Sequence, residues 1–171
     1  ALQGTRAGAF EGDILADMQG AVFRGGGDYA GIEFIISSDQ RALLCRYASG
    51  RRHLDPQDQL TLEWSGAYAH NHAAMMQTLI ISKACKKHLY MHAVAREALE
   101  ACEAAIMPGQ PMGDVFAAHA QIFEKAGLGH ARLNACGYAM GAIYNPIWVD
   151  FPMFYENNPR LMRERQVFFC I

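Results

Sequence analysis

Apolar residues recur every three to four positions in three stretches of the chain, which is the spacing of one buried helix face. Each stretch ends at glycine, or at proline followed by glycine, and these residues stop helices. The predicted helices are Gly12–Arg24 before Gly25–Gly27, Lys83–Met107 before Pro108-Gly109, and Asp114–Ala126 before Gly127.

Shorter apolar runs bounded by polar or turn-forming residues predict β-strands. The polar residues His70–His72 separate two of these runs, so that pair is predicted to form a hairpin-like unit. The predicted strands are Ile32–Ser37, Ala42–Tyr47, Leu60–Leu62, Ala73–Ile81 and Val167–Ile171. Helices and strands together predict an α+β fold, and an apolar strand at the end of the chain leads us to expect an incomplete domain.

Two segments 101 residues apart resemble each other, which predicts an internal repeat. The matches are Gly12-Asp13-Ile14-Leu15-Ala16 with Gly113-Asp114-Val115-Phe116-Ala117, Arg24 with Lys125, and Gly26 with Gly127. Because Gly-Asp begins many helices as a turn followed by an N-cap, coincidence is the competing explanation. The repeat predicts two similar halves, each built from a helix and sheet strands.

The composition and charge of the chain exclude several classes of function. With 171 residues, of which 51% are hydrophobic, the chain can form one domain with a buried core. Its net charge of −2, from 15 basic and 17 acidic residues, provides no basic field for nucleic acid and no membrane anchor. No apolar run is long enough to cross a bilayer, and the N-terminus lacks a signal pattern. We therefore expect a cytoplasmic protein that acts on a small molecule or a short peptide.

The cysteines and histidines give no metal motif. The five cysteines are odd in number and widely spaced, which favours free buried thiols over disulfides. Neither a Cys-x-x-Cys pair nor a His-Glu-x-x-His motif occurs. We therefore expect no structural metal and no cofactor.

Three groups of residues resemble motifs of one known superfamily, and together they extend over nearly the whole chain. They are Ile106–Gly109 followed by Gly113–Val115, the series Tyr47, Asp58, Leu60–Glu63 and Thr78, and the segment Gly137–Gly141. The chain is similar here to the pita-bread-fold hydrolases, the superfamily of prolidase, aminopeptidase P and creatinase. The resemblance implies two pseudo-symmetric α+β halves that share a curved antiparallel sheet, a site between them, and a homodimer.

The chain departs from the metal-dependent members of this superfamily at the ligand positions. The positions of two metal-binding aspartates and a metal-binding histidine fall on Glu63, Ala74 and Tyr138. The position of the next glutamate falls at or beside Ile171. One carboxylate among these four positions cannot hold two divalent ions, so we expect no bound metal pair.

Two longer motifs resemble a metal-independent member of the superfamily. They are Glu63-x-x-Gly66-x-Tyr68-x-x-x-His72, continuing to Thr78, and Gly137-Tyr138-x-x-Gly141-x-x-Tyr144-x-Pro146-x-Trp148. Both are similar to ectoine hydrolase in order and spacing. Creatinase fits less well, because it keeps a histidine where this chain has Tyr138. The resemblance implies cleavage of a C–N bond without a metal.

Three residues are candidates for catalysis. Glu63 lies between Leu62 and Trp64 in an apolar strand, where partial burial suits a carboxylate to act as base or nucleophile. His72 is the candidate acid/base partner, and Tyr138 is a candidate hydrogen-bond donor to the substrate or to an oxyanion. The alternatives are a surface glutamate, a solvated histidine and a tyrosine that fills the core.

Three further residues are candidates for substrate binding. Arg46 and Asn145 occupy the positions of two substrate-facing histidines of the superfamily. The guanidinium of Arg46 suits a substrate carboxylate, and a salt bridge to Asp58 or Glu63 is the alternative. Trp148 can offer its ring face to a cyclic or cationic substrate, and its alternative is a place in the core.

These residues predict a hydrolase of a small peptide-like or ectoine-like substrate, with Glu63 as base or nucleophile. Two alternatives stay open. One is a conventional metal-dependent Xaa-Pro aminopeptidase or dipeptidase, which divalent-ion dependence would reveal. The other is a catalytically silent homologue, which would bind a ligand in the same cleft without turnover.

Overall fold

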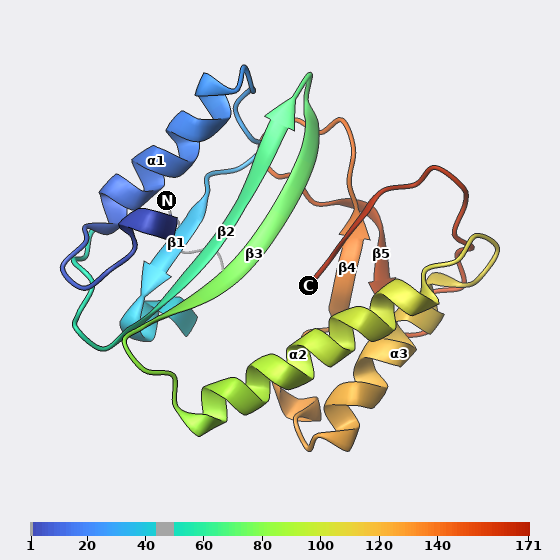
Figure 1. The fold of residues 1–171 in the computed structure, drawn as a ribbon. Coiled ribbons are helices and arrows are strands. Elements are labelled where there is room, and N and C mark those ends of the chain that lie inside the picture. Colours follow the sequence, from blue (N-terminus) through green and yellow to red (C-terminus); the bar gives the residue numbers. More distant parts are fainter. Residues whose placement is uncertain (1, 44–49) are drawn as a thin grey trace. The chain divides into compact units, whose positions relative to one another are not determined.

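The computed structural model describes residues 2–43 and 50–171, and the chain divides into two compact units (Figure 1). The first unit comprises Ala1–Ala84 with Ala142–Trp148, and the second comprises Cys85–Gly141 with Val149–Ile171. Each unit combines helical segments with a three-stranded antiparallel sheet. The predicted α+β class is therefore confirmed.

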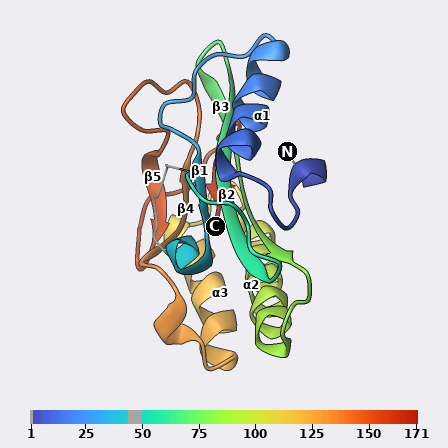
Figure 2. The ribbon, with the colours of Figure 1, turned by 90° about the vertical axis from the view of Figure 1, so that its left-hand side faces the viewer.

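The first unit is a sheet with one helix against one of its faces (Figure 1, Figure 2). Its elements are α1 (Glu11–Arg24), β1 (Ile35–Ser38), β2 (Asp58–Tyr68) and β3 (Asn71–Ile81), with short 3-10 helices at Leu2–Gly4 and Asp39–Leu43. The strand order is β1-β2-β3, so β2 is central. Ile14 and Met18, one turn apart on α1, are buried. This spacing is the one that predicted the helix.

Strands β2 and β3 form a long curved hairpin (Figure 1), in which every residue of β2 pairs with one of β3. Ala69 and His70 form the two-residue turn, with φ angles of 47° and 61°. Positive φ at both positions is typical of a type I′ turn, whose twist matches that of the flanking strands. The predicted polar tip is therefore a tight turn, and His72 already lies in β3.

The second unit places two helices beside another antiparallel sheet. Its elements are α2 (Lys86–Ala105), α3 (Met112–Lys125), a 3-10 helix at Gly129–Ala131, β4 (Ala135–Ala139), β5 (Asp150–Tyr155) and β6 (Phe168–Cys170). The strand order is β5-β4-β6. Helix α3 packs against β4 and β5, and α2 packs against α3. The core consists of Cys102, Met112, Val115, Phe116, Cys136, Phe154 and Met162.

The internal repeat is present in the main-chain hydrogen bonds. Helices α1 and α3 have 14 residues each, and the segment before each helix pairs with a later segment of the same unit. The matching N–H to carbonyl bonds are Glu11 to Arg52 and Met112 to Arg160, and Gly8 to Leu54 and Gly109 to Met162. Each unit therefore has two of these bonds at equivalent positions. A chance recurrence of Gly-Asp at two helix starts would not produce this match. The predicted pair of similar halves is confirmed.

The repeat continues into the sheets with a change of spacing. Ser38 of β1 pairs with Leu60 of β2, and Ala139 of β4 pairs with Phe168 of β6. The residue numbers differ by 101 between Ser38 and Ala139, but by 108 between Leu60 and Phe168. The connection between the equivalent strands is therefore longer in the second unit.

Element boundaries differ from the prediction where the chain turns. Strand β1 begins at Ile35 rather than Ile32, and it ends where Asp39, with φ 54°, donates its N–H to Asp58 Oδ1 at 3.0 Å. The predicted strand Ala42–Tyr47 begins inside a 3-10 helix, and its residues 44–47 lie outside the described residues. Strand β2 extends beyond its predicted apolar centre because the residues on both sides of that centre also pair with β3.

Two further expectations concern membranes and thiols. No helix in the described ranges is long and apolar enough to cross a membrane. Cys85, Cys102, Cys136 and Cys170 are free thiols, and Cys45 lies outside the described residues. Burial raises the pKa of the Cys170 thiol to about 12, so this thiol is a poor nucleophile.

Candidate functional site

Glu63 lies in the middle of β2 and is half-buried. Its partners across the sheet are Ile35 on β1 and Met76 on β3. Side chains alternate between the two faces of a sheet along each strand, so Glu63 points away from the face shared by Leu62 and Trp64. A central strand fixes this position from both sides, because its neighbours constrain the main chain of Glu63.

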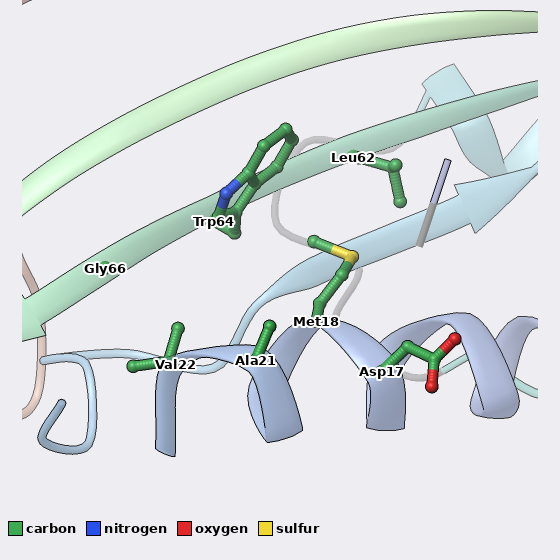
Figure 3. Close-up of a pocket in the computed structure, with 7 residues that line it drawn as sticks. All are labelled: Asp17, Met18, Ala21, Val22, Leu62, Trp64 and Gly66. Carbon is green, nitrogen blue, oxygen red and sulfur yellow. The ribbon is translucent and has the colours of Figure 1, made fainter. Parts of the chain in front are cut away.

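Trp64 faces α1 and belongs to the opposite side of the sheet from Glu63. A pocket of about 360 Å³ lies between α1 and β2, and its lining includes Met18, Val22, Leu62 and Trp64 (Figure 3). Because this lining is largely apolar, Trp64 contributes to the packing of the helix against the sheet. The sequence neighbours Glu63 and Trp64 therefore have different surroundings.

The strand register identifies the side chains that share the face of Glu63. Residues directly opposite each other in antiparallel strands lie on the same side of a sheet. On this described sheet, Glu63 and His72 are the ionisable members of that set. The neutral members are Ile35 and Ser37 on β1, Gln59, Thr61, Ser65 and Ala67 on β2, and Ala74, Met76, Thr78 and Ile80 on β3. Negative charge on this face is therefore confined to Glu63.

His72 is 6% exposed, and the main chain engages both of its ring nitrogens. Nε2 accepts a hydrogen bond from the Gly31 N–H at 2.9 Å. Nδ1 therefore carries the proton and donates it to the carbonyl oxygen of His70 at 2.7 Å. This neutral tautomer ties the hairpin tip to the loop around Gly31. An acid/base role would require His72 to give up one of these bonds.

His72 and Glu63 share a face but are not neighbours. The register pairs His72 with Ala67, which lies four residues from Glu63 along β2. At about 3.3 Å per residue, the two side chains start about 13 Å apart along the hairpin. The direct partnership expected from the sequence is therefore not formed, because strand register, not sequence alternation, sets the distance.

The segment 142–148 of the first unit carries Asn145 and Trp148. The Ile143 N–H donates to the carbonyl of His70 at 2.9 Å, which holds this segment beside the hairpin tip. Trp148 is 1% exposed and has almost no surface with which to touch a ligand, so the structure favours its place in the core. Asn145 is exposed and lines a pocket, so it keeps access to a ligand.

The remaining two candidates are Tyr138, which the structure describes, and Arg46, which it does not. Tyr138 lies on β4 of the second unit, is 3% exposed, and packs edge-on against Phe169 with ring centroids 5.5 Å apart. This packing fills the core, and its hydrogen bond to a substrate stays a prediction. Arg46 lies outside the described residues, so its carboxylate-binding role also stays a prediction.

A buried polar network in the first unit was not predicted from the sequence. Glu11 is fully buried and accepts hydrogen bonds from the N–H groups of Arg51 and Arg52 and from the Ser38 hydroxyl. The Arg52 guanidinium donates to Asp58 at 2.8 Å. Burial by itself would raise the pKa of Asp58, but main-chain N–H donors and Arg52 lower that pKa overall. Because Glu11, Arg52 and Asp58 all have hydrogen-bond partners within the unit, we assign this network to the stability of the fold.

The donor set of this chain does not fit a pair of metal ions. Among the four ligand positions implied by the resemblance, Glu63 supplies a carboxylate, whereas Ala74 has no donor atom and Tyr138 is packed in a core. By the internal repeat, Glu63 corresponds to Ile171, a hydrocarbon side chain. Among the described residues, no three His, Cys, Asp or Glu side chains come close enough together to hold an ion.

The repeated α+β units are those of the pita-bread fold, and solved structures share it. The chain covers 48% of the prolidase from Pyrococcus furiosus, with a TM-score of 0.89, 16% identity and 98% of this chain aligned. It covers 46% of the X-Pro aminopeptidase from Thermotoga maritima, with a TM-score of 0.86, 19% identity and 97% of this chain aligned. The chain thus spans about half the length of these proteins.

The sequence matches metallopeptidase family M24 over residues 1–170, so the chain belongs to this family. It is also 27% identical, over 139 residues, to an uncharacterised hydrolase/peptidase of Sinorhizobium fredii. That match covers 80% of this chain and 35% of the other protein. The predicted superfamily is confirmed, and the ectoine hydrolase branch stays a prediction.

Proposed function

We propose that this chain is part of a hydrolase that cleaves a C–N bond in a small peptide-like or ectoine-like substrate without a metal. Glu63 is the proposed general base or nucleophile. The composition of the sheet face around it carries the proposal, because the other strand positions of that face, His72 apart, are neutral. Such surroundings suit a carboxylate that exchanges a proton, and they lack the several carboxylates that two metal ions need.

Two routes are open to Glu63. As a general base, it takes a proton from a water molecule whose oxygen attacks the carbonyl or amidine carbon, and the proton then passes to the leaving nitrogen as the C–N bond breaks. As a nucleophile, its own oxygen bonds to that carbon, and the nitrogen leaves with a proton from solvent. Water then attacks the same carbon, which breaks the bond to Glu63, releases the product and restores the carboxylate. Both routes need the ionised carboxylate.

The other candidates take supporting roles in this proposal. Arg46 binds a substrate carboxylate and Asn145 hydrogen-bonds the substrate, and the role of Tyr138 as a donor to an oxyanion stays a prediction. His72 positions the hairpin tip through its two main-chain bonds, and Trp148 holds the 142–148 segment by its burial. The roles of His72 and Trp148 are thus changed from acid/base partner and ligand contact to support.

A metal-dependent Xaa-Pro aminopeptidase or dipeptidase is the second candidate, because solved structures with those names share the fold. This function requires activity on Xaa-Pro peptides, and a chelator must abolish that activity. Ala74 stands at an implied ligand position and has no donor atom, which argues against the metal-dependent function.

The deciding experiment compares the wild type with Glu63→Gln on proline dipeptides, ectoine and creatine, each with and without a chelator. Glutamine keeps the shape and hydrogen bonding but removes the basic oxygen. We expect kcat to fall by roughly a hundredfold or more, with little change in KM. Glu97→Gln, at an exposed position of α2, is the control and should keep wild-type turnover. Near-full turnover by Glu63→Gln would refute the assignment, and binding without turnover by the wild type would identify a silent homologue.

A further inference from the structure

A pocket of about 400 Å³ lies at the tip of the β2–β3 hairpin, a size in the range of small-molecule sites. The end of α1, the loop that follows it, the hairpin turn and the segment 142–148 contribute to it, and all four belong to the first unit. Its lining includes Phe23, Asp28, Tyr29, His70, Tyr144 and Asn145. Asn145 is the member of this set that the sequence made a candidate for substrate binding, and Tyr144 belongs to one of the sequence motifs.

Four of these side chains are rings, and they form two contacting pairs. Phe23 and Tyr29 meet edge to face with centroids 4.8 Å apart. His70 and Tyr144 lie at 4.3 Å with a tilt of 34°. Tyr29 and Tyr144 are nevertheless 76% and 65% exposed, so the rings are not part of a core. Exposed aromatic rings around a hollow are typical of a ligand site.

The main chain holds the pocket in place before any ligand arrives. The Asp28 N–H donates to the carbonyl of Ala67 at 2.8 Å, and Asp28 Oδ2 accepts from the His70 N–H at 3.1 Å. The Ile143 N–H donates to the carbonyl of His70 at 2.9 Å. These bonds join three separate segments, so a ligand would find the rings already positioned.

The charge of the pocket is negative. Asp28 provides a carboxylate, and the described lining contains no lysine or arginine. Ring faces and a carboxylate both attract a cation. A quaternary ammonium group has no N–H and can be held by ring faces, which form much of this lining, whereas a primary ammonium has three N–H donors that ring faces do not satisfy as water does. The pocket also contains Asn145, proposed above as a substrate contact. We propose that its rings and Asp28 bind a small organic cation through a quaternary ammonium group, without the participation of Glu63.

Calorimetric titration of the full chain with choline tests the proposal. The neutral isostere 3,3-dimethylbutan-1-ol has the same shape without the charge, and ethanolamine offers a primary ammonium. We expect choline to bind about tenfold or more tightly than the isostere, and more tightly than ethanolamine. Tyr29→Leu and Tyr144→Leu, which keep apolar surface but remove a ring face, should each raise the Kd for choline by about threefold to thirtyfold. Asp28→Asn keeps an acceptor for the His70 N–H but removes the negative charge, so it should also raise the Kd for choline.

Tyr68→Leu is the matched control, because Tyr68 is a 72% exposed tyrosine on the same hairpin and does not line the pocket. This variant and Glu63→Gln should bind choline as the wild type does, and thermal unfolding should show that every variant is folded. Equal binding of choline and its isostere, tighter binding of ethanolamine, unchanged affinity in both tyrosine variants, or no binding at tens of millimolar choline would each overturn the proposal. Loss of choline binding in Glu63→Gln would place the cation in the catalytic site and overturn its independence.

Discussion

Glu63 and Trp64 are adjacent in the sequence, yet their side chains serve opposite faces of β2. Trp64 packs toward α1, whereas Glu63 shares its face with Ile35 and Met76 from the neighbouring strands. The chemistry open to a residue in a sheet therefore depends on its cross-strand partners more than on its sequence neighbours. For Glu63 those partners are the apolar residues Ile35 and Met76, which supports the proton exchange proposed for its carboxylate.

Replacement of His72 by leucine should destabilise the first unit. The change leaves the buried Gly31 N–H without its partner, whereas the His70 carbonyl loses one donor and keeps the Ile143 N–H. One unsatisfied buried donor costs about 1–3 kcal/mol, so we expect the free energy of unfolding to fall by about 1–3 kcal/mol in urea titrations. His92→Leu, at an exposed position of α2, should change it by less than about 0.5 kcal/mol. Equal stability of the two variants would contradict the positioning role.

His119 of α3 should make the second unit sensitive to acid. Burial, and then the positive charge of Arg132, lower the pKa of His119 in the folded state. The unfolded chain therefore binds a proton more readily, and stability falls as the pH drops through the unfolded pKa of about 6.5. The Nδ1 atom is buried without a hydrogen-bond partner among the described residues, so His119→Leu removes the acid penalty without breaking a bond at that atom.

Urea titrations at pH 7.5 and pH 5.5 measure this effect. We expect the wild type to lose more stability between these pH values than His119→Leu does. His92→Leu is again the control, and it should keep the wild-type difference between the two pH values. If His119→Leu loses as much stability between pH 7.5 and pH 5.5 as the wild type does, His119 is not the titrating group.

The β2–β3 hairpin shows how a strained turn is tolerated within a long element. Ala69 has φ 47°, in the left-handed region that disfavours residues with a β-carbon, although asparagine visits it readily. We expect Ala69→Asn to raise the free energy of unfolding by about 0.5–1 kcal/mol, measured by urea titration. Ala73→Asn, at an exposed position within β3, should give no gain, because asparagine is disfavoured in strands. Destabilisation by Ala69→Asn would argue against the type I′ turn.

The two repeated helices show that one main-chain design accepts different side chains. Glu11 and Met112 begin α1 and α3, and each donates its N–H to an equivalent carbonyl. Glu11 also binds the N–H groups of Arg51 and Arg52, whereas Met112 packs into the core of the second unit. The repeat therefore preserves hydrogen bonding at the helix start, and the side chains have diverged to polar and apolar packing.

For the whole molecule, we expect no stoichiometric pair of divalent ions. By the internal repeat, the position equivalent to Glu63 is Ile171, which has no carboxylate. Ala74, on the same face as Glu63, has no donor atom. Elemental analysis of protein purified without a metal-binding tag should find iron, manganese, cobalt and zinc well below one ion per chain. Stoichiometric metal that a chelator removes together with activity would establish the metal-dependent alternative. The homodimer implied by the resemblance stays a prediction, which sedimentation analysis would check.

The sequence by itself determined the helices, the internal repeat, the family, and Glu63 as the carboxylate at the ligand positions. These are properties of local spacing and of residue identity, which a linear pattern preserves. It did not determine that His72 lies about 13 Å along the hairpin from Glu63, or that Trp148 is buried. Nor did it reveal that Phe23, Tyr29, His70 and Tyr144 meet around one pocket.

Those outcomes depend on contacts between distant segments. The bond from Gly31 to His72 joins residues 41 positions apart, and the bond from Ile143 to His70 joins segments that lie even farther apart in the sequence. Strand register and side-chain burial follow from such pairings, because they decide which residues face one another and which lose contact with water. Only the tertiary structure therefore decided that His72 supports the fold and that the exposed aromatic rings surround Asp28.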